Sequence, residues 1–108
     1  MKNDCLFCKI INKEISADFV METESLVAFK DINPKADVHL LIVPKKHIRS
    51  LNQIEQEDEK ILSELMFAAK ELAVMNKIDK SGYRVQVNVE KGGGQEVFHL
   101  HMHLIGNL

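Results

Sequence analysis

Three histidines stand at alternate positions near the end of the chain, in the stretch GGGQEVFHLHMHLIG that covers residues 92–106. They are His99, His101 and His103. On a β-strand, residues i and i+2 point to the same side and lie about 6.6 Å apart along the chain. We therefore expect three imidazoles in a row on one face of a strand, with the apolar residues between them on the opposite face.

An imidazole row on a strand can serve three purposes. A solvent-facing polar strand is the simplest, but imidazoles have no advantage there over lysine or threonine. One metal ion bound by all three rings conflicts with geometry, because the outer residues lie about 13 Å apart and metal–nitrogen bonds are about 2 Å long. Two of the rings can still bind a metal with ligands from elsewhere. The third purpose is nucleophilic attack on phosphorus, since neutral imidazole is a nucleophile and histidine forms covalent intermediates.

The glycines in front of the histidines favour chemistry on phosphorus. Gly92, Gly93 and Gly94 carry no side chains, so their backbone can approach an anion closely. Flanking imidazoles and backbone N–H groups can then hold phosphate oxygens while charge rearranges. A glycine run alone is typical of a flexible loop, but a run that leads directly into a histidine row is more specific.

The only two cysteines, Cys5 and Cys8, have the spacing C-x-x-C. This spacing is half of a tetrahedral zinc site. A redox role would require a strand–turn–helix context after a βαβ pattern, which the sequence lacks. Two buried free cysteines are the plain alternative.

Length and composition predict one domain, residues 1–108. The formal net charge of −2 argues against a nucleic-acid partner, because nucleic-acid-binding surfaces are usually strongly basic. No apolar run approaches the roughly 18 residues of a membrane span, so we expect no membrane partner. The first residues lack the apolar region and cleavage site of a signal peptide, which predicts a reducing, cytoplasmic location.

The elements that must position these residues follow from periodicity and turn signals. We expect a short helix over 4–14, strands over 18–22, 25–31 and 38–44, a long helix over 56–76, and strands over 83–89 and 98–105. The polar face of the strand over 83–89 holds Arg84, Gln86 and Asn88. The core-facing stripe of the long helix holds Ile61, Leu65, Ala68 and Leu72, with Leu62, Met66, Ala69 and Ala73 beside it. This order predicts an α+β fold with a mainly antiparallel sheet.

The motifs together resemble a known family. The segment HLHMHLI matches the pattern His-φ-His-φ-His-φ-φ, in which φ is apolar. The segments CLFCKIINKEI, AFKDINPKADVHLLIVPKKHI and GYRVQVNV extend the resemblance to the histidine triad nucleotide-binding proteins over nearly the whole chain. The resemblance implies a HIT-like fold, with a five-stranded sheet, one long helix, a short N-terminal helix and a homodimer that joins two sheets. It also implies hydrolysis of adenosine or guanosine 5′-phosphoramidates through a covalent nucleotidyl-histidine.

The resemblance assigns roles to individual residues. His101 resembles the nucleophile, His103 the residue that contacts the phosphate oxygens, and His99 the residue that orients the others. His39 resembles a fourth histidine of the site. Asp31 resembles the carboxylate that binds the ribose hydroxyls, although a turn explains an aspartate at this position equally well. The residues expected around the phosphate are Asn88, Gly94, Gln95 and Glu96, the last two through the backbone N–H groups of their loop. The apolar walls around the purine would be Leu6, Phe7, Ile10, Phe29 and Ile32.

Some members of this family bind zinc, and the matching ligands here would be Cys5, Cys8, His47 and His99. A zinc-bound His99 cannot also carry protons freely. The resemblance therefore implies a structural zinc that fixes the His99 ring and stiffens the histidine strand.

The chain departs from many relatives at two points. Glu96 stands where some relatives have a serine, and an ionised carboxylate neither donates a hydrogen bond nor attracts phosphate. The sequence stops at Leu108, without the C-terminal tail that many relatives have, so we expect a more open pocket.

Three other functions stay open on the sequence alone. They are a nucleotide-binding adaptor with incidental turnover, a hydrolase of dinucleoside polyphosphates, and a zinc-stabilised interaction module. The set of four histidines favours an enzyme, because binding alone needs fewer imidazoles. Apolar walls give no basis for choosing adenine over guanine.

Overall fold

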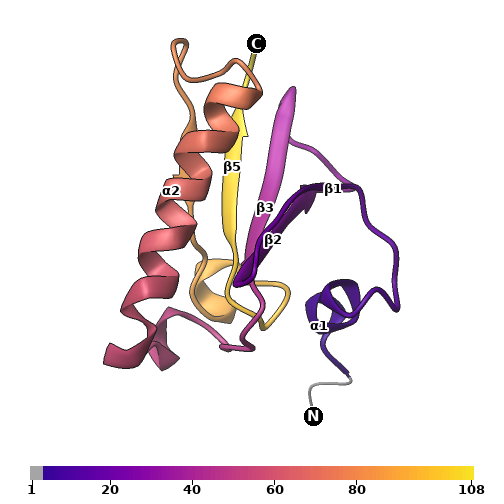
Figure 1. The fold of residues 1–108 in the computed structure, drawn as a ribbon, viewed down its shortest axis with the longest axis vertical. Coiled ribbons are helices and arrows are strands. Elements are labelled where there is room, and N and C mark those ends of the chain that lie inside the picture. Colours follow the sequence, from indigo (N-terminus) through magenta and orange to yellow (C-terminus); the bar gives the residue numbers. More distant parts are fainter. Residues whose placement is uncertain (1–3) are drawn as a thin grey trace.

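The computed structural model describes residues 4–108, which form a five-stranded antiparallel sheet in the order β1-β2-β3-β5-β4 (Figure 1). The helices and strands are α1 (Leu6–Ile11), β1 (Phe19–Glu22), β2 (Leu26–Lys30), β3 (Val38–Pro44), α2 (Glu59–Met75), β4 (Arg84–Gln86) and β5 (Met102–Gly106). Three short 3-10 helices lie in the connections, η2 (Leu51–Gln53), η3 (Gln56–Asp58) and η4 (Lys91–Gly93). The predicted α+β fold, with one long helix and a short N-terminal helix, is confirmed.

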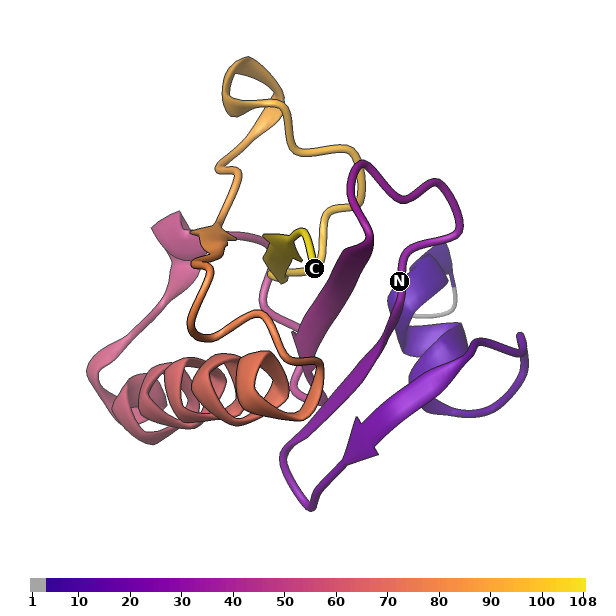
Figure 2. The same cartoon turned by 90° about the horizontal axis from the view of Figure 1, so that it is seen from above.

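The long helix α2 covers one face of the sheet, and α1 lies on the other face (Figures 1 and 2). The residues that α2 contributes to the core are Leu65, Ala68, Ala69, Leu72 and Ala73. The prediction for Met66 is wrong, because its side chain is 56% exposed at the margin of this stripe, beside the exposed Phe67. Within residues 4–108, no helix combines the length and apolarity needed to cross a bilayer.

The face on which α1 packs also carries the polar side chains of interest. Strand pairing places His39 opposite Ile105, and Ile105 opposite Arg84, across β3, β5 and β4. The next row along the strands holds Leu41, His103 and Gln86. Directly paired residues of antiparallel strands point to the same side. The histidines of β3 and β5 therefore share their face with Arg84 and Gln86.

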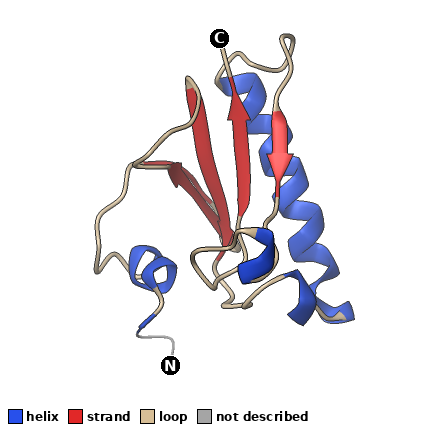
Figure 3. Ribbon diagram, turned by 180° about the vertical axis from the view of Figure 1, so that it is seen from behind, coloured by secondary structure: helices blue, strands red, loops and turns tan. Residues whose placement is uncertain are grey.

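Strands β4 and β5, drawn in Figure 3, are each shorter by three or more residues than the sequence predicts, whereas β1 and β2 are shorter by only one or two. Because β5 begins at Met102, only His103 of the three clustered histidines lies within a strand. The segment before β5 bonds to the loop after β3 instead, where the Leu100 N–H donates to the Ile48 carbonyl at 2.6 Å. β4 ends at Gln86, because the chain then turns into the loop around η4.

The long helix also begins later than predicted, since η3 precedes it. The Glu55 N–H donates to the Asp58 carboxylate at 3.0 Å, and the Lys46 ammonium lies 2.6 Å from the same carboxylate. These contacts stabilise a tight 3-10 turn in front of Glu59, where α2 starts. Of the three successive acidic residues at 57–59, Glu57 and Asp58 thus belong to this turn and only Glu59 to α2.

Candidate active site and metal centre

A cavity of about 710 Å³ opens between α1, the end of β2 and the loop that follows β4. This catalytic cavity is lined by most of the residues that the sequence predicts, namely Leu6, Phe7, Ile10, Phe29, Asp31, Ile32, Asn88, Gly94, Glu96, His101 and His103. Its volume is typical of a site for a small organic ligand. Three predicted residues do not line it: His39, His99 and Gln95.

The buried His101 ring has its tautomer set by the backbone. Its Nδ1 lies 2.7 Å from the carbonyl oxygen of His99, and a carbonyl only accepts hydrogen bonds. Nδ1 of the neutral ring therefore carries the proton, and Nε2 carries a lone pair. The ring packs edge-on against Phe7 and His103, with centroid distances of 5.0 and 5.1 Å. This packing fixes the ring at the cavity wall with a nucleophilic nitrogen available.

His39 and His103 form a second pair with assigned tautomers. The backbone N–H of Lys35 donates to His39 Nδ1 at 3.1 Å, so the proton of neutral His39 sits on Nε2. His39 Nε2 lies 2.9 Å from His103 Nδ1 and donates to it. The neutral His103 ring then carries its own proton on Nε2, which makes that nitrogen a donor suited to a phosphate oxygen.

Burial keeps these imidazoles neutral. Burial, the largest cause, and the neighbouring His101 and His39 rings together lower the pKa of His103 to about 4. Burial also lowers the pKa of His101 and of His39, although Asp31 opposes the shift at both rings. All three rings are therefore uncharged at neutral pH.

Asp31 takes part in a turn and faces the histidines. One carboxylate oxygen accepts the Asn33 N–H at 2.8 Å, which is the turn contact that the sequence offers as the plain explanation. The other oxygen lies 3.4 Å from His39 Nε2. Because the carboxylate also borders the catalytic cavity, the turn does not prevent it from accepting hydrogen bonds from a ligand.

Gly94 closes the loop that borders the cavity. Its φ of +87° lies in the left-handed region, and a Cβ there would stand 3.3 Å from Asn88 Nδ2. That Asn88 amide donates to the Gly93 carbonyl at 2.7 Å. The glycine therefore allows Asn88 to approach and brace the loop.

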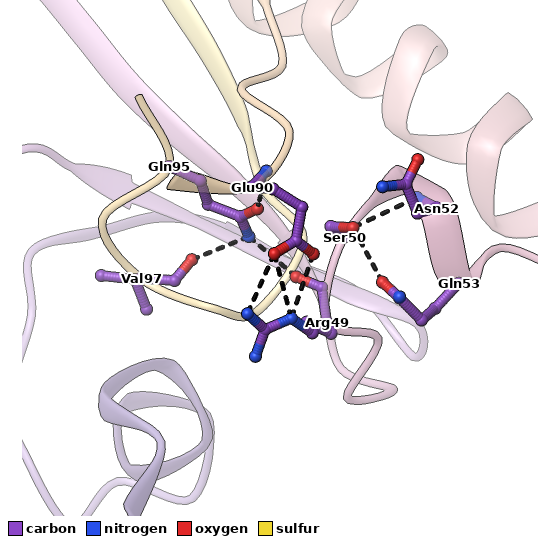
Figure 4. Close-up of polar contacts among 7 residues, drawn as sticks. All are labelled: Arg49, Ser50, Asn52, Gln53, Glu90, Gln95 and Val97. Atoms are coloured by element: carbon purple, nitrogen blue, oxygen red, sulfur yellow. Dashed lines mark hydrogen bonds and ion pairs between the residues drawn. The ribbon is translucent and has the colours of Figure 1, made fainter. Parts of the chain in front are cut away.

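Gln95 does not line the cavity. Its side chain supports this loop through hydrogen bonds to neighbouring backbone groups (Figure 4). Its buried side chain accepts the Glu90 N–H at 2.7 Å and donates to the carbonyls of Arg49 and Val97 at 2.7 and 3.0 Å. Its own backbone N–H donates to the Glu90 carbonyl at 3.1 Å. The loop itself thus uses this N–H, and its predicted contact with a phosphate stays a prediction.

Sequence reasoning missed an ion pair that supports the same loop. The Arg49 guanidinium binds both carboxylate oxygens of Glu90, at distances between 2.9 and 3.3 Å (Figure 4). It also lies over the Phe98 ring, 4.3 Å from the centroid. Neither residue belongs to a motif, and 41 positions separate them, so no local pattern points to the contact.

A cysteine–histidine cluster lies on the other side of Phe7. It consists of Cys5, Cys8, His47 and His99, whose donor atoms all lie within 4.8 Å of one another. Three of the four sulfur-to-nitrogen distances are 3.3–3.6 Å, and the Nδ1 atoms of His47 and His99 are 3.1 Å apart. Tetrahedral zinc, with bonds of about 2.3 Å to sulfur and about 2.05 Å to nitrogen, separates such atoms by about 3.6 and 3.3 Å. The donor set therefore fits a zinc ion.

The tautomer of His99 suits this cluster. Its Nε2 lies 2.8 Å from the Pro44 carbonyl and must donate to it, so Nδ1 presents a lone pair to the cysteines. Burial lowers the pKa of this fully buried ring to about 4. The ring of His99 thus belongs to the cluster, whereas its backbone carbonyl orients His101.

Comparison with known proteins identifies one family. A family model described as scavenger mRNA decapping enzyme C-term binding matches residues 4–108. Protein HitA of Neisseria gonorrhoeae is 45% identical over 104 residues, 96% of this chain and of that protein. Purine nucleoside phosphoramidase of Escherichia coli (strain K12) is 40% identical over 106 residues, 98% of this chain and 89% of that protein. The crystal structure of a HIT family hydrolase from Legionella pneumophila Philadelphia 1 matches with a TM-score of 0.93 and 48% identity, covering 94% of this chain and 91% of that one.

The lowered pKa of His103 predicts acid sensitivity of the fold. An unfolded chain binds a proton at this residue near its ordinary value of 6.5, whereas the folded chain does so only near 4. Stability from the neutral ring is therefore complete above about pH 6.5 and is lost as the pH falls towards 4. Between pH 7.5 and pH 5, the free energy of unfolding should fall in wild type and in His103→Gln. The fall should be smaller in the variant, by on the order of 1 kcal/mol.

Urea unfolding at both pH values measures this difference. The cysteine–histidine cluster is the same in both proteins, so its own pH dependence cancels in the comparison. Equal losses in wild type and variant would contradict a depressed pKa at His103.

Proposed function

The chain belongs to the histidine triad family, and we propose that it is a hydrolase of purine nucleoside 5′-phosphoramidates acting through a nucleotidyl–His101 intermediate. The observation that carries the proposal is the free Nε2 lone pair of His101 at the wall of a nucleotide-sized cavity. A relative that is 40% identical and is named for this activity supports the substrate class.

The apolar end of the catalytic cavity would hold the purine. Phe7, Ile10 and Phe29 are buried there, while Leu6 and Ile32 lie at the rim, 44% and 92% exposed. Farther along the cavity, the Asp31 carboxylate would accept hydrogen bonds from the ribose hydroxyls. This order places the α-phosphate at the polar end, beside His101 and His103.

In the first step, His101 Nε2 attacks the α-phosphorus as the bond from phosphorus to the amine nitrogen breaks. The departing nitrogen keeps the electron pair and takes up a proton from solvent. The His101 ring becomes positively charged, and its Nδ1–H then donates more strongly to the His99 carbonyl. The His103 Nε2–H would donate to a phosphate oxygen as charge rearranges.

In the second step, water attacks the same phosphorus and the bond to His101 Nε2 breaks, with its electron pair returning to the ring. The products are the nucleoside monophosphate and the free amine. One water is consumed overall: its hydroxyl goes to phosphorus, and its remaining proton balances the one that the amine took up. The ring returns to its starting tautomer, since the His99 carbonyl still holds the Nδ1 proton.

His101→Asn should abolish turnover and spare binding. We expect kcat for a fluorogenic adenosine phosphoramidate to fall by about 10³-fold or more, because the nucleophile is lost. The affinity for AMP, measured by calorimetry, should change little. Intact-mass spectrometry after rapid quenching in denaturant at alkaline pH should show a nucleotidyl adduct on wild type and none on the variant.

Each alternative function has its own outcome in this experiment. AMP binding without turnover by wild type would favour an adaptor. Turnover of diadenosine polyphosphates in preference to the phosphoramidate would favour a polyphosphate hydrolase. Equal rates in wild type and His101→Asn would reject the assigned nucleophile.

We also propose a structural zinc ion at the cysteine–histidine cluster. The ion would hold α1 against the segment before β5 and would supply no part of the chemistry, because His101 points into a separate cavity. Its two thiol ligands require a reducing compartment, so the proposal includes a cytoplasmic location.

Replacing both cysteine ligands tests the zinc proposal. Cys5→Ser with Cys8→Ser should lose one equivalent of zinc by elemental analysis and lower the free energy of unfolding by on the order of 3 kcal/mol. The kcat of the folded fraction should stay within about threefold of wild type, because no step passes through the metal. Unchanged metal content, or complete loss of turnover in a folded variant, would contradict a structural zinc.

Finally, we propose that two copies associate through the β4 edge and the outer face of α2. β4 is an edge strand whose backbone groups can pair with a second copy. The outer face of α2 exposes four large apolar side chains, Met66, Phe67, Val74 and Met75. Together these features suit an antiparallel extension of the sheet with two helices packed across it.

Phe67→Glu should convert the dimer into a monomer, because it introduces a charge into the apolar contact. The matched control is Ile32→Glu, which changes another exposed apolar residue at the mouth of the catalytic cavity. Light scattering coupled to gel filtration measures both. A wild-type monomer, or dissociation by the control alone, would contradict the proposed interface.

A further inference from the structure

A second cavity, of about 550 Å³, adjoins the catalytic cavity. Lys35 lines both of them, so the two spaces meet at this residue. Arg84, Ser81 and Asn107 contribute further polar groups to the second cavity. The catalytic mechanism described above uses none of these side chains.

Strand β4 connects the two cavities by a row of side chains. The β4 row consists of Arg84 and Gln86, which share one side of the strand, and of Asn88, which lies just beyond the end of β4 and is joined to the row by the Gln86 side chain. Gln86 and Asn88 line the catalytic cavity, and the Gln86 amide donates to Asn88 at 3.2 Å. Arg84 lines the second cavity. The row therefore leads from the phosphate end of the site to an arginine.

The register fixes where this arginine lies. Gln86 pairs with His103, and Arg84 pairs with Ile105, which in turn lies opposite His39. Arg84 thus sits one row beyond His103 on the same face, about 6.6 Å along the strand. Its charge reaches the site, since it contributes to lowering the pKa of His39 after the larger effect of burial.

The two cations at this cavity have no acidic partner within residues 4–108. Of the two arginines, Arg49 is bound to Glu90, whereas no carboxylate lies within ion-pair distance of Arg84. The Lys35 ammonium likewise has no ion pair among these residues, although its backbone N–H binds His39. The nearby Asp37 carboxylate accepts the Leu108 N–H instead. An exposed, unpaired arginine and lysine on one cavity favour an anionic ligand group.

We propose that Arg84, together with Lys35, binds a carboxylate on the leaving amine, so that the preferred substrates are nucleotides joined through phosphorus to the α-amino group of an amino acid. This inference rests on the proposed phosphoramidase function. In such a substrate, two bonds place the carboxylate carbon about 2.5 Å from the amine nitrogen. Arg84 lies one row from His103 on the same face, and its planar guanidinium matches a carboxylate through two parallel hydrogen bonds.

The proposed dimer is compatible with this subsite. Pairing at the β4 edge uses backbone groups, whereas the β4 row projects from the face of the sheet. The carboxylate is recognised and not transformed, so the bond that breaks is the same phosphorus–nitrogen bond.

Two substrates that differ only in this charge test the proposal. One is adenosine 5′-phosphoramidate of alanine with a free carboxylate, and the other is its neutral alaninamide counterpart. Wild type should show a kcat/KM about tenfold higher for the carboxylate. Arg84→Gln should bring this ratio close to one, chiefly by lowering kcat/KM for the carboxylate compound. Continued turnover of the alaninamide compound shows that the variant is folded. Lys35→Gln should lower the ratio in the same direction.

The matched control is Lys80→Gln, which removes one exposed charge that lines neither cavity and should keep the wild-type ratio. The same ratio in wild type and Arg84→Gln would overturn the subsite. Turnover of neither compound by wild type would overturn the proposed function instead. In that case, calorimetric affinities of the two compounds for His101→Asn, with and without Arg84→Gln, decide the subsite: a carboxylate preference that disappears with Arg84 supports it, and no preference overturns it.

Discussion

Backbone groups decide which nitrogen of each buried imidazole carries its proton, and the chemistry of this site depends on that assignment. The Pro44 carbonyl holds the proton of His99 on Nε2, and the His99 carbonyl holds the proton of His101 on Nδ1. The Lys35 N–H binds Nδ1 of His39. In each ring, one nitrogen is therefore fixed as the hydrogen-bond donor and the other as the acceptor. Because burial also keeps the rings uncharged, these roles persist at neutral pH.

His99 links the candidate metal centre to the active site. The ring of His99 faces the cysteines, while its carbonyl orients His101 two positions later. Phe7 packs edge-on against both rings, at 6.0 Å from His99 and 5.0 Å from His101. Any group that fixes the His99 ring therefore also fixes the peptide that positions the nucleophile. A zinc ion at the proposed centre would therefore hold this peptide in place without touching the substrate.

Local sequence patterns predicted the fold and the clustering of the site residues. They did not predict the long-range contacts that hold the backbone of the site in place. Alternation correctly placed the histidines near one another and the β4 row on one side, because side-chain direction is a local property. It overestimated β5, since the segment before Met102 pairs with a loop about 50 positions away, where Leu100 bonds to Ile48. It also missed the support of the glycine loop by Gln95 and by the pair of Arg49 and Glu90, which depends on contacts between distant segments. The zinc ligands, the dimer and the substrate remain proposals that the fold is consistent with.

The position of β5 in the sheet has a consequence for how the protein is made. β5 is the last strand of the chain, yet it lies between β3 and β4 in the interior of the sheet (Figure 3). A growing chain on the ribosome that has not yet released this strand leaves β3 with an open edge and β4 with no partner in the sheet. The active site also needs residues from both ends of the chain, because Phe7 packs against His101. Folding of the sheet and assembly of the catalytic centre should therefore coincide once β5 is free to pair, and until then the edge of β3 is open to pairing with another chain.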